Sequence, residues 1–426
     1  MSSFIINGPA RVQGSLSVSG SKNAVLALLA ASLMCPRVSL RRVPNLLDVS
    51  VLMTLLQQCG VVIDKQSHHH FVLDCRYVSN FEANYHLVRQ LRASFFVLGP
   101  LLTRHGFARI SLPGGCKIGE RPVDLHLDAL RLMGANISIK HGYVTASAPD
   151  GLKGAEINFA KSSVGATHTA IMAATLAKGR TTITNAACEP EVGALIDFLN
   201  AAGAKISGKN SSSVTIDGVL ALNEVDFELI PDRIQTGTYL IAAAMTQGQI
   251  ELQRACADHV RPLLRLLTDA GADVVCEGDT IALTMRQRPL AQSFTTAVYP
   301  DFPTDLQAPM MALNAVAEGC SEITETMFEN RFMHVPELVR MGADIAISGQ
   351  TAHITGVSML EGAQVQASDL RAGAALVLAG MCAKGKTSIS KIHHIDRGYE
   401  YFVDHLKSMR VSVERSLDEQ KELFAL

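Results

Sequence analysis

The chain has 426 residues, of which 48% are hydrophobic and 18% charged, and its net charge is −2. This composition is typical of a globular protein with large cores, and the small net charge gives no overall field that would favour nucleic acid. The longest nearly uninterrupted apolar run, residues 24–35, is too short to span a bilayer. The first residues lack the basic region and apolar core of a signal peptide, and the nine cysteines contain no Cys-x-x-Cys pair. We therefore expect a cytoplasmic protein with reduced thiols.

One pattern recurs along the chain: an apolar helical stretch, a glycine usually followed by alanine, and an apolar strand. The copies lie 68 to 74 residues apart, and each predicts a helix C-terminus that leads into a strand. An alternating pair of strands follows, as at 343–348 and 351–356. The glycines, and the arginine of a sixth, degenerate copy, are Gly60, Gly134, Gly203, Gly271, Gly342 and Arg410.

A second class of helices, rich in Ala, Leu and Met, recurs in phase with the first. Helices that are apolar on most faces are usually buried. Each repeat therefore has the order strand, helix, strand, helix, strand, strand over ~70 residues, and such repetition indicates stacked or ring-arranged units. Helices of this second class are expected to begin near Lys22, Arg92, Val164, Arg233, Thr304 and Arg371.

The N-terminal residues are predicted to complete the sixth repeat. Residues 4–22 resemble residues 353–371, whereas little after 411–414 resembles the end of a repeat. Six repeats in a chain of this length divide into two domains of three. We expect a boundary near Pro231, with one domain at 22–229 and the other at 230–426 plus 1–21.

A glycine-rich segment at 113–124 contains Cys116, with Lys117 and Arg121 close behind it. Glycines let the backbone turn and let a ligand approach closely. Nearby cations stabilise a thiolate, so this is a favourable setting for a reactive cysteine, and an arginine can bind phosphate or carboxylate bidentately. The competing interpretation is a surface turn with an incidental cysteine. The other eight cysteines are expected to be packing residues.

Cations recur where the apolar helices begin. Lys22, Arg92, Arg233 and Arg371 occupy such positions, and Arg397 stands at the expected start of the last helix. A helix N-terminus already attracts anions through its free N–H groups and its dipole. Each cation alone is also consistent with a salt bridge, but cations at matching positions predict a shared polyanionic ligand in the cleft between two domains.

Asp305 interrupts this series, because it takes the matching place in the fifth repeat. A carboxylate among cations is suited to removing a proton from a substrate. By its position alone, the same residue is equally consistent with a helix N-cap.

The tract His68-His69-His70 lies between the two strands that follow Gly60. A zinc site needs a fuller set of ligands, so a solvated hairpin is the better interpretation. The sequence has no Walker loop, no Gly-x-Gly-x-x-Gly motif and no Ser-His-Asp order, which leaves nucleotide hydrolysis and redox cofactors without support. We expect neither a metal nor a cofactor.

Nine motifs carry a resemblance to one enzyme family: Gly20-Ser21-Lys22-Asn23, Leu91-Arg92-Ala93-Ser94, the Cys116 loop, Ser163-Val164-Gly165-Ala166-Thr167, Pro231-Asp232-Arg233, Phe302-Pro303-Thr304-Asp305, Asn330-Arg331-Phe332-Met333-His334, Ser368-Asp369-Leu370-Arg371 and Asp396-Arg397-Gly398-Tyr399-Glu400. The chain resembles the UDP-N-acetylglucosamine 1-carboxyvinyltransferases, enolpyruvyl transferases of the 5-enolpyruvylshikimate-3-phosphate synthase superfamily. The resemblance covers essentially the whole length, and the Cys116 loop is its most specific part. One departure is that some relatives carry Trp where this chain reads Ser94-Phe95-Phe96.

The resemblance implies a fold of two inside-out α/β-barrel domains, each with three βαβαββ repeats, and an active site in the cleft between them. It also implies the reaction. The enolpyruvyl group of phosphoenolpyruvate would be transferred to the 3-hydroxyl of UDP-N-acetylglucosamine, and phosphate would be released. In this family that is the first committed step of peptidoglycan synthesis, on which the cell wall, cell shape, cell division and the cell cycle depend.

The resemblance assigns catalytic roles as well. Cys116 would protonate the methylene carbon of phosphoenolpyruvate, or add to the neighbouring carbon as a covalent thioketal, and it would be the target of the epoxide fosfomycin. Asp305 would orient or deprotonate the attacking hydroxyl. Lys22 would contact phosphoenolpyruvate, and Arg397 would bind phosphate or carboxylate. The residues that the resemblance assigns to substrate binding are Lys22, Asn23, Arg92, Arg121, Pro122, Val123, Asp124, Leu125, Lys161, Ser162, Ser163, Val164, Arg233, Asp305, Met327 through its backbone, Asp369 and Arg371.

Two other functions compete with this one. A 5-enolpyruvylshikimate-3-phosphate synthase has the same fold and reaction type, but that enzyme lacks the Gly-Gly-Cys loop. A non-catalytic clamp could also be built from six similar units, but a clamp on nucleic acid needs a basic lining. We expect no nucleic acid, membrane or obligate protein partner.

Overall fold

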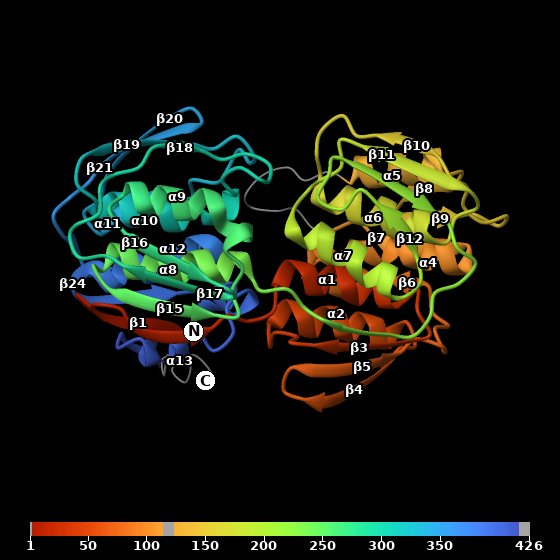
Figure 1. The fold of residues 1–426 in the computed structure, drawn as a ribbon, viewed down its shortest axis with the longest axis horizontal. Coiled ribbons are helices and arrows are strands. Elements are labelled where there is room, and N and C mark those ends of the chain that lie inside the picture. Colours follow the sequence, from red (N-terminus) through yellow and green to blue (C-terminus); the bar gives the residue numbers. More distant parts are fainter. Residues whose placement is uncertain (1, 114–122, 417–426) are drawn as a thin grey trace, which may run out of the picture. The chain divides into compact units, whose positions relative to one another are not determined.

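The computed structural model describes residues 2–113 and 123–416. These residues divide into two compact units. The middle unit runs from Gly20 to Ile230, and the terminal unit consists of the described residues up to Ser19 and from Pro231 onward. Each unit encloses its own hydrophobic core. Figure 1 shows the same plan in both, with helices at the centre and sheets around them.

Each repeat contributes one core helix, and all six begin within one residue of the predicted position. Two of them, in the second and fifth repeats, open with a turn of 3-10 helix. The core helices are α1 (Lys22–Ser32), η1 (Arg92–Val97) continuing into α4 (Leu98–His105), α6 (Val164–Thr175), α8 (Arg233–Met245), η3 (Thr304–Leu306) continuing into α10 (Gln307–Val316), and α12 (Leu370–Cys382).

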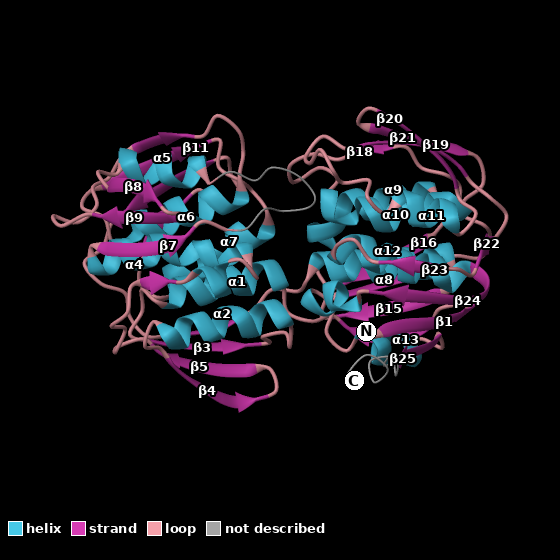
Figure 2. Cartoon of the chain, turned by 180° about the vertical axis from the view of Figure 1, so that it is seen from behind, coloured by secondary structure: helices cyan, strands magenta, loops and turns pink. Residues whose placement is uncertain are grey.

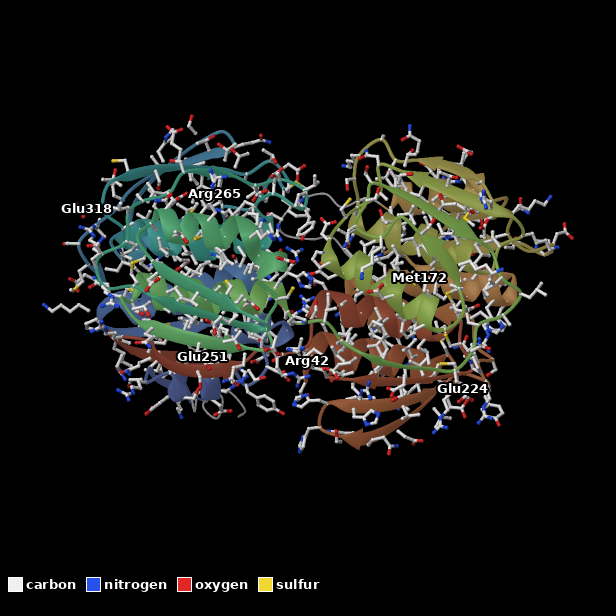
Figure 3. The ribbon with its side chains drawn as sticks, viewed as in Figure 1. Arg42, Met172, Glu224, Glu251, Arg265 and Glu318 are labelled. Atoms are coloured by element: carbon white, nitrogen blue, oxygen red, sulfur yellow. The ribbon has the colours of Figure 1, made fainter. Side chains whose placement is uncertain are left out.

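The core helices have no polar face, and the structure buries them as their composition predicts. Every residue of α8 is buried, and Met172 of α6, labelled in Figure 3, lies inside the middle unit. Glu224 and Glu318, labelled in the same figure, are exposed at the surface. Such all-apolar helices are stable only when other elements enclose them on every side, which explains why the sheets lie outside.

The second helix of each repeat packs its buried residues against the core of its unit, and short helices complete the connections. The second helices are α2 (Leu47–Gln58), α5 (Asp124–Leu132), α7 (Pro190–Ala201), α9 (Arg261–Asp269), α11 (Val335–Arg340) and α13 (Phe402–Ser408); the short ones are α3 (Tyr85–Val88), η2 (Ala257–Val260) and η4 (Ile392–Arg397).

The repeated glycine follows the second helix in five of the six repeats. Its φ lies between 91° and 103° in all five, at Gly60, Gly134, Gly203, Gly271 and Gly342. A side chain rarely adopts this backbone conformation, so glycine is the favoured residue there. Arg410 takes the place in the sixth repeat with φ 66°. The degenerate copy therefore keeps the turn at some conformational cost, and the prediction of a common helix end is confirmed.

Six sheets surround the helices, one for each repeat, and Figure 2 shows their strands. In hydrogen-bonded order, the sheets of the middle unit are β14 (Val225–Glu228), β3 (Arg37–Arg41), β5 (His70–Asp74) and β4 (Val62–Ser67); β6 (Glu82–Ala83), β7 (Phe107–Ser111), β9 (Tyr143–Ser147) and β8 (Asn136–Lys140); and β10 (Glu156–Asn158), β11 (Arg180–Thr184), β13 (Ser213–Asp217) and β12 (Lys205–Ser207). Two sheets of the terminal unit are β2 (Gln13–Ser17), β15 (Gln249–Gln253), β17 (Thr280–Thr284) and β16 (Asp273–Glu277); and β18 (Phe294–Thr295), β19 (Cys320–Thr324), β21 (Thr351–Thr355) and β20 (Asp344–Ser348). In the remaining sheet of that unit, β22 (Leu360–Glu361) and β23 (Gln364–Gln366) lie beside β24 (Ala383–Ser390), which is followed by β1 (Ser3–Gly8) and β25 (Ser412–Ser416).

In four repeats the strand before the core helix pairs in parallel with the strand after it, as β10 pairs with β11 across α6. The other two repeats exchange these strands. β2 precedes α1 but pairs with β15 of the fourth repeat, and β14 precedes α8 but pairs with β3 of the first. The exchange follows from the chain passing from one unit to the other directly after β2 and after β14.

This exchange corrects part of the prediction for the N-terminus. β1 completes the sixth repeat as expected, because it pairs with both β24 and β25. β2 does not belong to that repeat and completes the fourth. The sequence similarity correctly marks β2 as the strand that precedes a core helix, but it carries no information on the strand's partner.

Candidate functional site

Three predicted site residues, Cys116, Arg121 and Pro122, lie outside the described residues, as does the neighbouring Lys117. The rest of the predicted segment opens α5. Val123 is the buried N-cap residue of that helix, Asp124 is exposed in its first turn, and Leu125 is partly buried against the core.

Lys22 is the first residue of α1, and its position follows from the N-cap of that helix. Ser21 Oγ accepts a hydrogen bond from Ala24 N at 3.3 Å, which fixes the start of the helix. The Lys22 ammonium is nearly buried and lies 2.7 Å from Asp48 Oδ2, in the first turn of α2. Asn23 follows it and is partly exposed. Asp48 therefore orients the lysine, and sequence reasoning missed this role.

Arg92 opens η1, and Ser163 and Val164 open α6. An aromatic cluster links these starts to the start of α5. His126 of α5 packs edge-on against Phe95 with ring centroids 5.5 Å apart, and its Nδ1 lies 2.8 Å from Thr169 Oγ1 of α6. The structure thus brings the predicted positions 92, 123–125 and 163–164 into one neighbourhood of the middle unit.

The segment before α6 contains the remaining predicted residues of this unit. Lys161 is exposed and Ser162 is partly exposed. Ser163 is the N-cap, and its Oγ accepts a hydrogen bond from Ala166 N at 3.3 Å. Ser163 itself has extended backbone, and the helix N-terminus that it caps favours an anionic ligand.

In the terminal unit, Asp305 lies between two arginines. Its Oδ1 accepts a hydrogen bond from Arg331 Nη2 at 2.8 Å, and its Oδ2 accepts one from Arg371 Nη2 at 3.0 Å. Both guanidinium groups are about 95% buried, whereas 29% of the Asp305 side chain is exposed. The N-cap interpretation is therefore wrong, because Pro303 caps η3 and the carboxylate faces cations instead.

The ionisation of Asp305 is strongly favoured. Burial opposes it, but the positive charges of Arg371, Arg331 and Arg233 outweigh that effect and hold the pKa of Asp305 well below its usual range. Two charge-assisted hydrogen bonds in a partly buried position also fix the carboxylate rigidly. Arg331 belongs to a recognised motif, but sequence reasoning gave it no role.

Close packing of α8 against η3 positions the charged residues around Asp305. At Gly237 of α8, a Cβ atom would lie 2.6 Å from Leu306 Cδ1 and 2.9 Å from Leu263 Cδ2. Only glycine therefore lets α8 approach η3 at this distance without moving those leucines. The approach brings Arg233, at the start of α8, into the field of Asp305.

A buried tyrosine connects Arg371 with α8. Tyr399 Oη lies 2.8 Å from Thr238 Oγ1, and it accepts a long hydrogen bond of 3.4 Å from Arg371 Nη1. Burial raises the pKa of Tyr399, so the phenol stays protonated and supports the arginine as a neutral partner.

Asp369 lies at the start of a helix, whereas Arg397 does not. Asp369 caps α12, because its Oδ1 accepts hydrogen bonds from Arg371 N at 2.9 Å and Ala372 N at 3.2 Å. Arg397 is the last residue of η4, and the last helix begins only at Phe402. The prediction that Arg397 stands at a helix start is wrong, because the Asp-Arg pair closes a 3-10 helix; Asp396 itself pairs with Arg415 at 2.6 Å.

Met327 lies in the turn after β19, and the side chain of Glu325 shapes that turn. Glu325 Oε1 accepts hydrogen bonds from Met327 N at 2.8 Å and Phe328 N at 3.3 Å. The same carboxylate accepts a hydrogen bond from Thr304 Oγ1 at 2.8 Å, directly before Asp305. Sequence reasoning missed Glu325, although its position two residues before Met327 was a possible signal.

Within the described ranges, no group of three or more His, Cys, Asp or Glu residues is arranged to hold a metal ion. The histidine tract forms the turn between β4 and β5 as predicted, with His70 Nε2 lying 3.0 Å from Ser39 Oγ. All eight described cysteines are free, but Cys276 and Cys320 are exposed. The prediction of buried packing is wrong for these two, because each lies at an exposed position of its strand. In the described part of the chain, no helix is long and apolar enough to cross a membrane.

A family model described as EPSP synthase (3-phosphoshikimate 1-carboxyvinyltransferase) matches residues 6–406. The chain belongs to this family. Within the family, it is 48% identical over 417 residues to the UDP-N-acetylglucosamine 1-carboxyvinyltransferase of Coxiella burnetii (strain Dugway 5J108-111), covering 97% of this chain and 96% of the relative. The enzyme of the same name from Escherichia fergusonii is 49% identical, with 97% and 99% covered. The predicted family is confirmed.

Solved structures of this family share the fold. The enolpyruvyl transferase NikO from Streptomyces tendae aligns with a TM-score of 0.88 at 24% identity, over 97% of this chain and 99% of the other. EPSP synthase from Acinetobacter baumannii aligns with a TM-score of 0.76 at 18% identity, over 98% and 100%. Together with the six βαβαββ repeats, these neighbours confirm the predicted fold class.

Proposed function

We propose that this protein transfers the enolpyruvyl group of phosphoenolpyruvate to the 3-hydroxyl of UDP-N-acetylglucosamine and releases phosphate. The observation that carries the proposal is the identity of nearly half of all residues, over 97% of the chain, with enzymes named UDP-N-acetylglucosamine 1-carboxyvinyltransferase. The reaction is the first committed step of peptidoglycan synthesis, and it takes place in the cytoplasm. It uses two small-molecule substrates and no cofactor.

The chemistry of the candidate residues in the middle and terminal units agrees with this reaction. Addition of a hydroxyl to an enol ether needs an acid at one carbon and a base or orienting group at the hydroxyl. Cys116 is the proposed acid, and Asp305 is the proposed partner of the hydroxyl. The tetrahedral intermediate carries phosphate and carboxylate, so fixed cations stabilise it. Lys22 and Arg397 are proposed for phosphoenolpyruvate, together with Arg121.

The two arginines that contact Asp305 limit how well its carboxylate can act as a base. A carboxylate held by Arg331 and Arg371 accepts a proton poorly, because both cations favour the charged form. We infer that anionic substrate groups compete for these arginines when they bind. The competition raises the basicity of Asp305 only when the hydroxyl is in place, and until then the carboxylate orients the hydroxyl.

The proposal keeps the domain limits predicted from the sequence, 22–229 and 1–21 plus 230–426, with an active site formed by residues of both. Lys22, Arg92 and Cys116 would come from the first domain, and Asp305 and Arg397 from the second.

A phosphate-release assay with two acceptors tests the proposal. The purified protein is mixed with phosphoenolpyruvate and either UDP-N-acetylglucosamine or shikimate 3-phosphate. We expect release with the sugar nucleotide only. The second acceptor is a specific alternative, because the matching family model is named for 3-phosphoshikimate 1-carboxyvinyltransferase. Release with shikimate 3-phosphate alone would overturn the proposal in favour of that activity.

Replacing Arg397 by alanine is expected to weaken the use of phosphoenolpyruvate far more than the binding of sugar nucleotide. Hydrogen bonds to charged groups are worth about 1.5–3 kcal/mol, so the KM for phosphoenolpyruvate should rise by about 10- to 100-fold. Calorimetry should show UDP-N-acetylglucosamine affinity within about twofold of wild type. Arg340→Ala, on the exposed face of α11, serves as the control. Equal losses for both ligands would refute this assignment.

A further inference from the structure

Glu325 is a buried carboxylate outside the predicted catalytic set. Only 2% of the residue is exposed. Its Oε1 accepts hydrogen bonds from Thr296 Oγ1, Met327 N and Phe328 N at 2.8, 2.8 and 3.3 Å, and its Oε2 accepts one from Thr304 Oγ1 at 2.8 Å. A buried charge is costly unless its oxygens are satisfied, and here both oxygens have donors.

The four donors come from three different segments of the terminal unit. Thr296 directly follows β18, Thr304 opens η3, and Met327 and Phe328 form the turn after β19. A second link joins the first and third segments, because Thr326 N donates to Thr296 Oγ1 at 3.0 Å. A single carboxylate thus joins segments that are separated by up to 32 residues of sequence, from Thr296 to Phe328.

Two of these segments carry residues of the proposed site. Thr304 directly precedes Asp305, whose carboxylate would meet the 3-hydroxyl of the sugar. The backbone of Met327 is the proposed contact for the sugar nucleotide. The distance between the group that holds the sugar and the group that acts on its hydroxyl therefore depends on the hydrogen bonds of Glu325.

On this geometry, and resting on the proposed function, we propose that Glu325 is a positioning residue that fixes the Asp305 carboxylate relative to the sugar-binding backbone at Met327. It does not touch substrate. Glu325 would act by aligning the sugar hydroxyl with the Asp305 carboxylate. A misplacement of about 1 Å between reacting groups can cost about 100-fold in rate.

If Glu325 only stabilised the fold, its replacement would affect the kinetic constants differently, so a structural role and a positioning role can be distinguished. Loss of a stabilising contact lowers the folded fraction, and it leaves the kinetic constants of the folded enzyme unchanged. Loss of a positioning contact lowers kcat and changes the KM of the substrate that is misplaced. Because the Met327 turn would hold only the sugar nucleotide, the KM for phosphoenolpyruvate should change little.

The experiment compares Glu325→Ala, Glu325→Gln and wild type, each assayed well below its unfolding temperature. Glutamine keeps an acceptor for Thr296, Met327 and Phe328, and its amide can donate to Thr304. We expect Glu325→Ala to lose about 30- to 100-fold in kcat and to raise the KM for UDP-N-acetylglucosamine, and Glu325→Gln to recover kcat to within about fivefold of wild type. Glu322→Gln, an exposed change on strand β19 just before Glu325, is the matched control and should keep wild-type kinetics.

A second variant covers the case in which Glu325→Ala does not fold. Thr304→Val removes only the hydrogen bond to Oε2 and leaves the other three in place. We expect kcat to fall by about 5- to 10-fold at nearly unchanged KM for phosphoenolpyruvate.

Unchanged kcat in folded Glu325→Ala or in Thr304→Val would overturn the positioning role, as would equal KM increases for both substrates. The wild-type enzyme in the same assay separates this failure from that of the proposed function. A wild type that is active while the variants match it refutes only the role of Glu325. A wild type that releases no phosphate with UDP-N-acetylglucosamine overturns the proposed function and this inference with it.

Discussion

Replacing Asp305 by asparagine is expected to lower kcat by about 10²- to 10⁴-fold, the usual effect of losing a general acid or base. The amide cannot accept the proton of the sugar hydroxyl, and it cannot pair with both Arg331 and Arg371, which contact the two carboxylate oxygens at 2.8 and 3.0 Å. Steady-state rates of phosphate release measure the effect. Because the arginines hold the pKa of Asp305 well below its usual range, the carboxylate stays ionised in mildly acid buffer. The ratio of wild-type to variant kcat/KM, which reports the free enzyme, should therefore stay constant down to about pH 5.

The control for this change is Asp344→Asn, at an exposed position on β20 of the same unit. It should keep wild-type rates. Asp305→Asn should also lower the unfolding temperature, because it leaves two nearly buried guanidinium groups without their carboxylate. A variant with wild-type kcat would show that Asp305 neither orients nor deprotonates the hydroxyl.

Replacing Cys116 by serine is expected to reduce turnover by about 10³-fold or more, because a hydroxyl is a far weaker acid than a thiol. The residue lies outside the described part of the chain, so the reason rests on its glycine-rich sequence beside Lys117 and on the family resemblance. Cys116→Asp should keep measurable turnover, since a carboxylic acid can also donate a proton. Wild-type turnover in the serine variant would contradict the role of Cys116 as acid.

Fosfomycin gives an independent test of the same residue. We expect the epoxide to alkylate wild type once and to leave Cys116→Ser and Cys116→Asp unmodified. Several of the other thiols are poor competitors: burial raises the pKa of Cys35 and Cys382 to about 12, and it also raises the pKa of Cys276. Thiols with raised pKa values contain little of the reactive thiolate at neutral pH. Peptide mapping that places the adduct on a different cysteine would refute the assignment.

Much of the fold was predictable because each repeat carries its own local signals. The glycine after each second helix marks a turn that needs positive φ, and the apolar composition of the core helices predicts their burial. Strand pairing was less predictable. Residues 13–17 resemble other strands that precede a core helix, yet β2 pairs with a strand of the fourth repeat. Local sequence determines that a strand forms, whereas the path of the chain between units determines its partner.

The geometry of the candidate site was predictable where charge recurs at helix starts, as at Lys22, Arg233 and Arg371. It was not predictable where function depends on contacts between distant residues. The pairing of Asp305 with Arg331 and Arg371 joins residues up to 66 positions apart, and no local pattern distinguishes it from an N-cap. The hydrogen bonds of Glu325 likewise join three segments that meet only in the folded chain.

The most direct test of the proposed reaction is the identity of its product. The protein is incubated with carbon-13-labelled phosphoenolpyruvate and UDP-N-acetylglucosamine, and the products are examined by mass spectrometry and NMR. We predict one equivalent of phosphate, and a sugar nucleotide that carries the labelled enolpyruvyl group in ether linkage at the 3-position. Phosphate release without a labelled sugar nucleotide, or a label at any other hydroxyl, would contradict the proposed function.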